Sequence, residues 1–435
     1  MASGPLQRCC ASQRTGQARD ARSVNVELPI VIVGGGTAGS TVAAQLAPLT
    51  QRHIIVCEPG DTSRHDDHSR FFDVVADDAL ISRESVDLSS TCVTDSYLQA
   101  RAIGGGSAVN GMLLSGDEPP HLRGLTRMAT EEAMGQVARA LLEAGGRACR
   151  LWWNGGRWNP GRALMHLVDE GRVELRHHEV TRVLHDDGVV TGVVCNGKVI
   201  STDCVVLTAG ALASPRLLLA SGFDALNTTI GEGVQDHPCL TFTMALKTHQ
   251  VSRFDACVVL DVDLDDGFFG LIVGYERASS DDEEHGLLSA LLMNPRSRGR
   301  IDPATGKTQF NVLDDGNDAR AMTQLVRRCI SLLSAGPVHD IATDTWGDAH
   351  GTTLGTLMEM GDRELETWIR RSVAPVSHVA SSLHLSVDEN GFLKGAIGVV
   401  VADASVLPEV PRETPAAPVT MEALRIARTL GGLLK

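Results

Sequence analysis

The sequence predicts an α/β fold in which a Rossmann-like domain with a parallel sheet is joined to a domain with an antiparallel sheet. Three observations predict it. Residues 29–58 read as strand, glycine turn, helix and strand. More strand-like stretches follow between 173 and 208, and short apolar or β-branched runs recur between 238 and 310. A βαβ unit makes its two strands parallel, whereas closely spaced short runs are typical of antiparallel sheets.

Length and composition are those of a globular protein. With 435 residues the chain is long enough for two packed domains, and 43% hydrophobic with 21% charged residues is an ordinary balance. The net charge of −15 disfavours nucleic acid or an anionic membrane as a partner, because both attract basic surfaces. No apolar run reaches the roughly 18 residues of a transmembrane segment.

The first residues and the cysteines bear on location. Residues 1–27 are polar and lack the apolar stretch of a secretory signal, so we expect a disordered N-terminal extension. The ten cysteines are scattered except for Cys9 and Cys10, and no CxxC pair occurs. We therefore expect free thiols in a reducing cytoplasm and no metal site.

The segment 29–58 carries the first functional signal. Its apolar run at 29–33 is typical of a strand buried on both faces, and it is followed by a helical pattern at 38–49 and a second strand at 53–57. Gly34, Gly36 and Gly39 satisfy the pattern G-x-G-x-x-G. In that pattern the glycines permit a tight turn, backbone access to a pyrophosphate and close helix–strand contact.

The start of the helix and the end of the second strand complete this signal. Thr37 and Ala38 open the helix, whose first backbone N–H groups are expected to point at the phosphates. Glu58 follows Gly39 by 19 residues, where a carboxylate can accept hydrogen bonds from a ribose diol. An acid at this place disfavours a 2′-phosphate and leaves FAD or NAD as the dinucleotide.

Later segments extend the two predicted sheets. Residues 173–184 and 192–206 are strand-like with a turn at 186–188, and 205–208 lead into a helical pattern at 217–221. Four further runs predict the antiparallel sheet, which we expect to form a wall of a substrate site, at 240–245, 256–262, 268–273 and 287–293. Three helical patterns follow at 320–335, 364–371 and 415–434.

Four other segments resemble the glucose–methanol–choline (GMC) oxidoreductase family. Residues 102–112, AIGGGSAVNGM, resemble its first signature, and residues 209–222, AGALASPRLLLASG, resemble its second. QDHP at 235–238 is similar to the family's short following segment, and VADASVLP at 401–408 to its Asp-x-Ser strand. The resemblance spans most of residues 29–430 and implies an FAD-binding Rossmann-like domain of the GMC type.

The resemblance implies FAD rather than NAD, and it places cofactor contacts on matching positions. The first signature contributes pyrophosphate and flavin contacts, a strand near 180 meets the adenine through its backbone, and the last segment lies under the ribityl chain. The implied residues are Gly105, Ser107, Asn110, Gly111, Val180, Ala209, Asp403 and Ala404. A plainer alternative for these segments is an ordinary loop at 104–106 and a helix cap at Asp403.

The resemblance also implies a catalytic histidine. Family members oxidise an alcohol by passing a hydride to flavin N5 while a base takes the hydroxyl proton, and histidine suits that task. His378 lies 25 residues before Asp403, where the family has histidine ahead of Gly-Thr, but Ser381 and Ser382 follow it here. The alternative is a structural histidine, and His384 is the second candidate.

The second catalytic position of the family, usually Asn or His, falls on Thr414, six residues after Pro408. A threonine hydroxyl can hydrogen-bond an alcohol but cannot act as a base near neutral pH. We therefore expect His378 to be the single base, with Thr414 or Glu413 only positioning the substrate.

The resemblance suggests domain boundaries and one shortened region. We expect an FAD-binding domain over 28–237 and 373–435 and a substrate domain over 238–372. Within 28–237 the family's cap is shortened to 117–150, which has a helical composition, so the active site is expected to be more open. Three tryptophans follow that either line a substrate pocket or pack the region, namely Trp152, Trp153 and Trp158.

The function implied is FAD-dependent oxidation of the CH–OH group of a small-molecule alcohol, with oxygen, a quinone or a redox protein as electron acceptor. Short actinobacterial members associated with mycofactocin, a peptide-derived redox cofactor, look most similar, since they share the GG-x-AVNG form of the first signature and the PRSRG segment at 295–299. The alternative is a catalytically degenerate flavin-binding protein in a biosynthetic or regulatory complex, which the residues at 381, 382 and 414 motivate.

Overall fold

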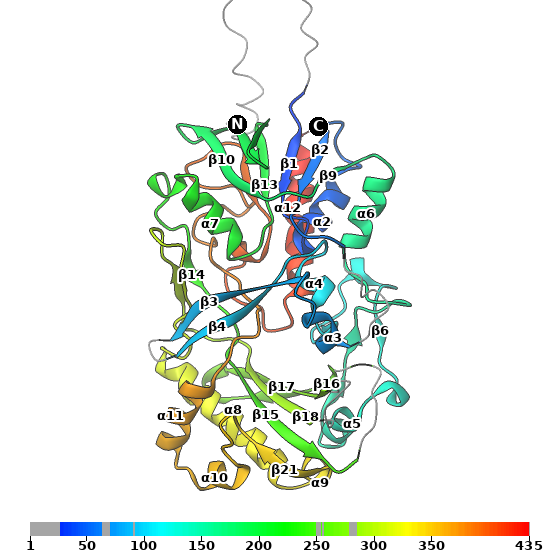
Figure 1. Cartoon of the computed structure of the whole chain (residues 1–435), viewed down its shortest axis with the longest axis vertical. Helices are drawn as coiled ribbons and strands as arrows, with labels where there is room; N and C mark the ends of the chain where they lie inside the picture. The colour runs from blue at the N-terminus through cyan, green and yellow to red at the C-terminus, as the bar shows by residue number, and fades with distance from the viewer. Residues whose placement is uncertain are drawn as a thin grey trace, which may run out of the picture.

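The computed structural model describes residues 27–62, 70–89, 92–248, 254, 256–277 and 285–434. The expected N-terminal extension, apart from Glu27, lies outside these residues. Figure 1 shows a parallel-sheet region at one end and an antiparallel-sheet region at the other, with a long hairpin between them. This arrangement confirms the predicted α/β fold.

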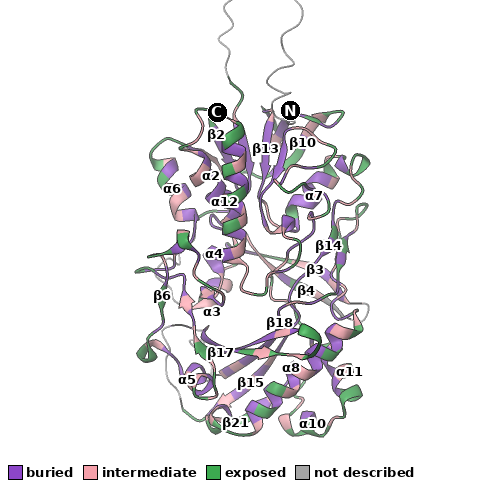
Figure 2. Ribbon diagram, turned by 180° about the vertical axis from the view of Figure 1, so that it is seen from behind, coloured by how far each residue is buried: buried purple, intermediate pink, exposed green. Residues whose placement is uncertain are grey.

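The parallel sheet contains the predicted βαβ unit. Its five strands run in the order β22 (Val399–Val401), β13 (Cys204–Leu207), β1 (Ile30–Val33), β2 (Ile54–Cys57) and β9 (Glu174–Arg176), and every neighbouring pair is parallel. Helices α2 (Thr37–Leu46) and α12 (Ala416–Leu433) pack against each other in the same core. All residues of β1, β2 and β13 are buried, as their continuous apolar sequence predicts (Figure 2).

Two predicted strand regions are subdivided. Residues 173–184 were expected as one strand but form β9 and the start of β10 (Val180–Asp186), which belong to different sheets. Residues 192–206 divide into β11 (Val189–Cys195), β12 (Lys198–Ser201) and β13. The break between β11 and β12 is the Asn196–Gly197 turn, in which both residues have positive φ, a signature of a tight hairpin.

The antiparallel sheet confirms the prediction for the middle of the chain. Its order is β21 (Ala342–Trp346), β15 (Cys239–Leu246), β18 (His285–Leu292), β17 (Phe269–Arg277), β16 (Ala256–Asp263) and β7 (Arg147–Ala148). Alternate side chains, including Phe242 and Leu288, enter one core with helix α8 (Gly316–Ser334). Helix α11 (Asp362–Ser372) packs on α8, and both lie along one side of the sheet in Figure 2.

A long hairpin was not predicted. Strands β3 (Ile81–Ser89) and β4 (Cys92–Ala100) join β20 (Thr308–Gln309), β19 (Gly299–Ile301) and β14 (Glu232–Val234) in a separate sheet. The buried positions of β3 are interrupted by exposed polar residues, so its sequence carries only a weak apolar pattern. The hairpin crosses between the two main sheets (Figure 1).

The shortened cap is not the helical segment that its composition suggested. Within 117–150 the only α-helix is α5 (Gln136–Glu143), accompanied by two 3₁₀ turns and the short strands β6 (Arg127–Met128) and β7. Proline and glycine residues interrupt the remaining sequence. Trp152 and Trp153 are 1% and 7% exposed and belong to the core, so they pack the region.

Each of the remaining elements has nine residues or fewer. They are α3 (Phe71–Val75), α4 (Gly106–Val109), β5 (Leu113–Leu114), η1 (Pro120–Leu122), η2 (Glu131–Ala133), β8 (Arg150–Leu151), α6 (Gly161–Asp169), α7 (Ala213–Ala220), η3 (Phe223–Ala225), η4 (Asp265–Gly267), α9 (Pro337–Asp340), α10 (Leu354–Glu359) and η5 (Ala404–Val406). Within the described ranges, none of the helices combines the length and apolarity that crossing a bilayer requires.

Candidate active site

The glycine turn between β1 and α2 is packed as tightly as its sequence pattern predicts. Gly34 has a φ of +101°, which disfavours any residue with a side chain. A Cβ atom on Gly39 would lie 1.8 Å from the Gly34 carbonyl oxygen and 2.7 Å from the Thr208 hydroxyl. The helix therefore approaches the strand at a distance that only glycine permits, as in dinucleotide-binding turns.

The first GMC-like signature lies directly beside this turn. A Cβ on Gly105, whose φ is +54°, would lie 2.8 Å from Gly36 Cα. The Thr37 and Ser107 hydroxyl oxygens are 2.9 Å apart and connect the two loops. At the start of α2 the first backbone N–H groups have no acceptor within the helix and are free to bind an anion. Two adjacent glycine turns at a helix N-terminus are suited to a pyrophosphate, so these residues fit FAD.

Glu58 lies next to the same turn but is already engaged. Its two carboxylate oxygens accept the backbone N–H groups of Gly35 at 2.8 Å and Gly60 at 2.7 Å. The side chain is buried, and burial raises the pKa of its carboxyl above the ordinary value. Each carboxylate oxygen has a second lone pair, so Glu58 can still accept a ribose hydroxyl while it orders the loop.

Asp403 connects the second signature to the last strand of the sheet. One carboxylate oxygen accepts the Gly210 N–H at 2.8 Å and the Ser214 hydroxyl at 2.6 Å, and the other accepts the Ser405 N–H at 2.9 Å. Asp403 is only 2% exposed. Its carboxylate thus holds the loop from Ala209 against Ala404, and it also caps η5.

The other expected cofactor residues are placed as follows. Val180 begins β10 and pairs with Cys195. Asn110 caps the C-terminus of α4. Its backbone carbonyl oxygen accepts two hydrogen bonds from the buried Arg157 guanidinium, at 2.7 and 2.6 Å. A Cβ on Gly111 would meet no atom within 4 Å, so the backbone borders open space there.

His378 is paired with a second histidine that the sequence did not identify as functional. Its Nδ1 atom lies 2.9 Å from Nδ1 of His237, and the two rings are perpendicular. His237 is completely buried, and its Nε2 atom lies 2.9 Å from the Pro411 carbonyl oxygen. The only sequence signal for His237 was its place in the QDHP segment.

Burial keeps both imidazoles neutral. It lowers the pKa of His237 to about 4, and it lowers the pKa of His378 well below 6.5, an effect to which His237 adds. The backbone N–H groups of both histidines donate to Oδ1 of Asp236, at 2.7 and 2.9 Å. The neutral imidazole is the form of histidine that accepts a proton.

Thr414 lies in the loop that also contains Pro411. Its hydroxyl donates to the Leu113 carbonyl oxygen at 2.8 Å, and its backbone N–H donates to the Ser115 hydroxyl at 2.8 Å. The loop therefore contacts both His237, through Pro411, and the segment after the first signature, through Thr414. The neighbouring Glu413 is half-buried, and burial together with Asp117 raises the pKa of its carboxyl.

The change from Gly-Thr to Ser-Ser after His378 has a structural cost at one of the two positions. Ser381 has a φ of +73°, is fully buried, and its hydroxyl has no hydrogen-bond partner among the described residues. Ser382 keeps a hydroxyl where the family has threonine and donates it to the Ala211 carbonyl oxygen.

Ser381→Gly is therefore expected to stabilise the protein by about 1 kcal/mol. Relief of the left-handed conformation gains roughly 1–2 kcal/mol and removal of the unpaired hydroxyl adds to it, while the entropy of glycine takes back about 0.5–1 kcal/mol. Chemical denaturation measures the change. The matched variant Ser382→Ala, which leaves a buried carbonyl unpaired, should destabilise by about 1 kcal/mol or more. Equal effects of the two substitutions contradict this interpretation.

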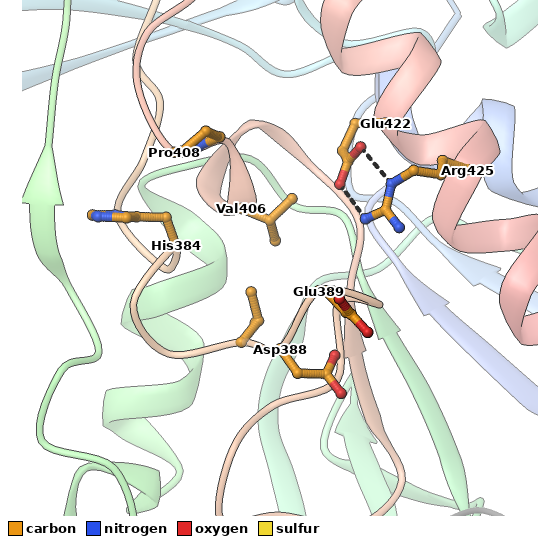
Figure 3. Close-up of a pocket in the computed structure, with 9 residues that line it drawn as sticks. His384, Asp388, Glu389, Val406, Pro408, Glu422 and Arg425 are labelled. Carbon is orange, nitrogen blue, oxygen red and sulfur yellow. Dashed lines mark hydrogen bonds and ion pairs between the residues drawn. The ribbon is translucent and has the colours of Figure 1, made fainter. Parts of the chain in front are cut away.

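His384, the second candidate base, belongs to a different surface. It lines a pocket of about 210 Å³ together with Val406, Pro408, Asp388 and Glu389, beside the Glu422–Arg425 ion pair of α12 (Figure 3). Its Nδ1 atom lies 2.6 Å from the Ser381 carbonyl oxygen. Neither His237 nor His378 lines this pocket.

Comparisons with known proteins agree with these features. Residues 29–269, more than half of the chain, match the family model described as FAD dependent oxidoreductase, and residues 295–423 match that described as GMC oxidoreductase. A GMC-type oxidoreductase from the thcA 5′ region of Rhodococcus erythropolis is 26% identical over 274 residues, which cover 54% of this chain and 51% of that protein. The chain thus spans about half the length of this curated relative.

Solved structures share the fold over nearly the whole chain. Pyridoxine 4-oxidase from Mesorbium loti superposes with a TM-score of 0.79 at 20% identity, covering 93% of this chain and 99% of that one. A fungal aryl-alcohol oxidase superposes with a TM-score of 0.73 at 14% identity, covering 94% and 99%. The family model matched over residues 29–269 shows that the chain belongs to the FAD-dependent oxidoreductases, and the model matched over residues 295–423 relates its C-terminal part to the GMC oxidoreductases.

Proposed function

We propose that this protein uses FAD to oxidise the CH–OH group of a small-molecule alcohol, with His378 as the base. One observation carries the proposal: the neutral imidazole of His378 is held by His237 beside the loop that contains Thr414. The names of two structural neighbours, a pyridoxine 4-oxidase and an aryl-alcohol oxidase, support an alcohol as the donor.

FAD, His378 and Thr414 have separate roles in the proposed reaction. When bound, FAD supplies the acceptor for a hydride from the alcohol carbon. His378 takes the hydroxyl proton, because burial keeps its imidazole neutral at pH 7. The Thr414 hydroxyl donates to the Leu113 carbonyl oxygen, and its oxygen already accepts the Ser115 backbone N–H at 3.2 Å. At most one lone pair of that oxygen is left to accept the alcohol hydroxyl, and the group cannot act as a base. Thr414 therefore positions the alcohol.

The rate of flavin reduction is expected to be nearly independent of pH from about pH 8 down to about pH 6. Histidine with the ordinary pKa of about 6.5 would be mostly protonated at pH 6 and the rate would fall about fourfold. Because the pKa of His378 is well below that value, its imidazole stays neutral at pH 6. The decrease of the rate on the acid side of the pH profile, the acid limb, therefore shifts to lower pH. Stopped-flow reduction across this range measures the limb, and an apparent pKa of 6.5 or higher contradicts the assignment.

The reaction class is tested by anaerobic reduction of the FAD-loaded protein with a panel of alcohols. Bleaching of the flavin absorbance by at least one primary alcohol, with formation of the matching aldehyde, is the expected result. Retention of FAD without bleaching by any donor would instead favour a degenerate flavin-binding protein, an alternative that the residues Ser381 and Thr414 motivate.

Three finer proposals accompany this function. Residues 28–237 and 373–435 are proposed as the FAD-binding domain and 238–372 as the substrate domain, which the membership of β22 in the parallel sheet supports. Seven cysteines are buried in the described part of the chain as thiols, which supports a cytoplasmic location. The alcohol panel includes reduced mycofactocin (mycofactocinol), the donor suggested by the short-family resemblance, and the acceptors tested are oxygen, a quinone and a redox protein.

A further inference from the structure

We propose that His237 is a positioning residue that fixes His378 in the tautomer with hydrogen on Nδ1, so that Nε2 is the atom that takes the alcohol proton. This inference rests on the proposed function and specifies its base at the level of one atom. It follows from two short contacts and the chemistry of their partners.

The first contact fixes the hydrogen of His237. Its Nε2 atom is 2.9 Å from the carbonyl oxygen of Pro411, which can only accept a hydrogen bond. Nε2 of His237 therefore carries hydrogen. Because His237 is completely buried and neutral at pH 7, its Nδ1 atom has no hydrogen and presents a lone pair.

The second contact passes this constraint to His378. The two Nδ1 atoms are 2.9 Å apart, a distance that requires one hydrogen between them, since two lone pairs or two N–H groups repel there. With a lone pair on His237, the hydrogen belongs to His378 Nδ1. In a neutral His378 the remaining nitrogen, Nε2, then has the free lone pair.

The other protonation patterns conflict with the surroundings. The reverse tautomers would place the lone pair of His237 Nε2 against the Pro411 carbonyl oxygen. A protonated His237 would be a cation in a completely buried position without a facing carboxylate among the described residues. The nearest acid, Asp236, uses Oδ1 for the backbone N–H groups of both histidines and accepts the Tyr97 hydroxyl at Oδ2.

The chain of hydrogen bonds orients the base and does not export its proton. After Nε2 of His378 takes a proton, the Nδ1–H group continues to donate to His237, so no rearrangement is required. Beyond His237 the ring meets the backbone carbonyls of Pro411 and Met293. A proton that reached His237 would have no titratable acceptor at that end, so it stays on His378 until His378 itself releases it.

The tautomer can be read in the unmodified FAD-loaded protein by ¹⁵N NMR of labelled histidines, with His378→Gln used to assign the His378 signals. The expected result at pH 7 is a protonated Nδ1 and an unprotonated Nε2. The opposite tautomer, or an imidazolium, overturns the proposal. This measurement needs no turnover, so it remains informative if none of the alcohols reduces the flavin, which would contradict the proposed function instead.

Two substitutions then test the role of His237. His237→Leu removes the acceptor and is expected to lower the limiting rate of flavin reduction at least about 10-fold, with a mixed tautomer at His378; a wrong tautomer costs serine proteases as much as about 10⁴-fold. His237→Asn offers a carbonyl oxygen near the original Nδ1 and should keep the rate within about threefold. A packing role predicts equal losses in both variants and an unchanged tautomer, and that outcome would overturn the inference.

Discussion

Replacing His378 by alanine is expected to slow anaerobic flavin reduction by an alcohol about 10²–10⁴-fold, the usual contribution of a positioned base. His378 is the neutral imidazole beside the Thr414 loop, whereas Thr414 cannot take a proton in its place. FAD should stay bound, because the glycine turns and Asp403 are untouched. Stopped-flow absorbance on the reconstituted variant measures both quantities.

The control for this prediction is another histidine of the same segment. His384→Ala removes an imidazole six residues away that lines the separate pocket of Figure 3, and it is expected to change the rate less than about twofold. If His378→Ala reduced its flavin as fast as the parent protein, His378 would not be the base.

Replacing Gly39 by alanine is expected to weaken FAD binding at least about 10-fold and to destabilise the protein by roughly 1–3 kcal/mol, the usual cost of overpacking. The added methyl group would lie 1.8 Å from the Gly34 carbonyl oxygen, so α2 must move away from β1. Its N-terminus then moves away from the Gly105 turn, and the two halves of the pyrophosphate site separate. Flavin content after purification and fluorescence titration of the apoprotein measure the loss.

Gly432→Ala is the matched helical control. Gly432 is an exposed residue of α12, and a Cβ there would meet no atom within 4 Å. Alanine should keep FAD affinity and add a few tenths of a kcal/mol of stability through its higher helix propensity. Equal FAD affinity in the Gly39 and Gly432 variants would show that tight packing of α2 is not needed for the cofactor.

The sequence predicted those parts of the fold whose signal is local. The βαβ unit at 29–58 was predictable because buried parallel strands are continuously apolar and the turn between them requires glycine. The Asn196–Gly197 turn was readable in principle, since the pair is a strong hairpin signal, yet the apolar run around it masked the turn. The β3–β4 hairpin was not predictable, because exposed polar residues interrupt the buried positions of β3, and because the partners of the hairpin, β20 and Asp236, are distant in the sequence.

The candidate site divides in the same way. Resemblance located His378 and Thr414 but gave no reason to connect them with His237, because two atoms 2.9 Å apart come from residues 141 positions apart. It also marked Ser381 and Ser382 as equal departures. The structure shows that Ser381 has a left-handed backbone conformation. Ser382, in contrast, keeps a hydroxyl that donates a hydrogen bond to the Ala211 carbonyl oxygen.

The order of strands in the parallel sheet has a consequence for synthesis of the protein. Strand β13 pairs on one side with β1 and on the other with β22, which is contributed by residues 399–401. Asp403, which holds the Gly210 loop, follows directly. On the ribosome, the outer edge of β13 therefore stays unpaired until almost all of the chain described here has been translated. We expect the FAD site to be complete only at that stage, because Asp403 holds the Gly210 loop.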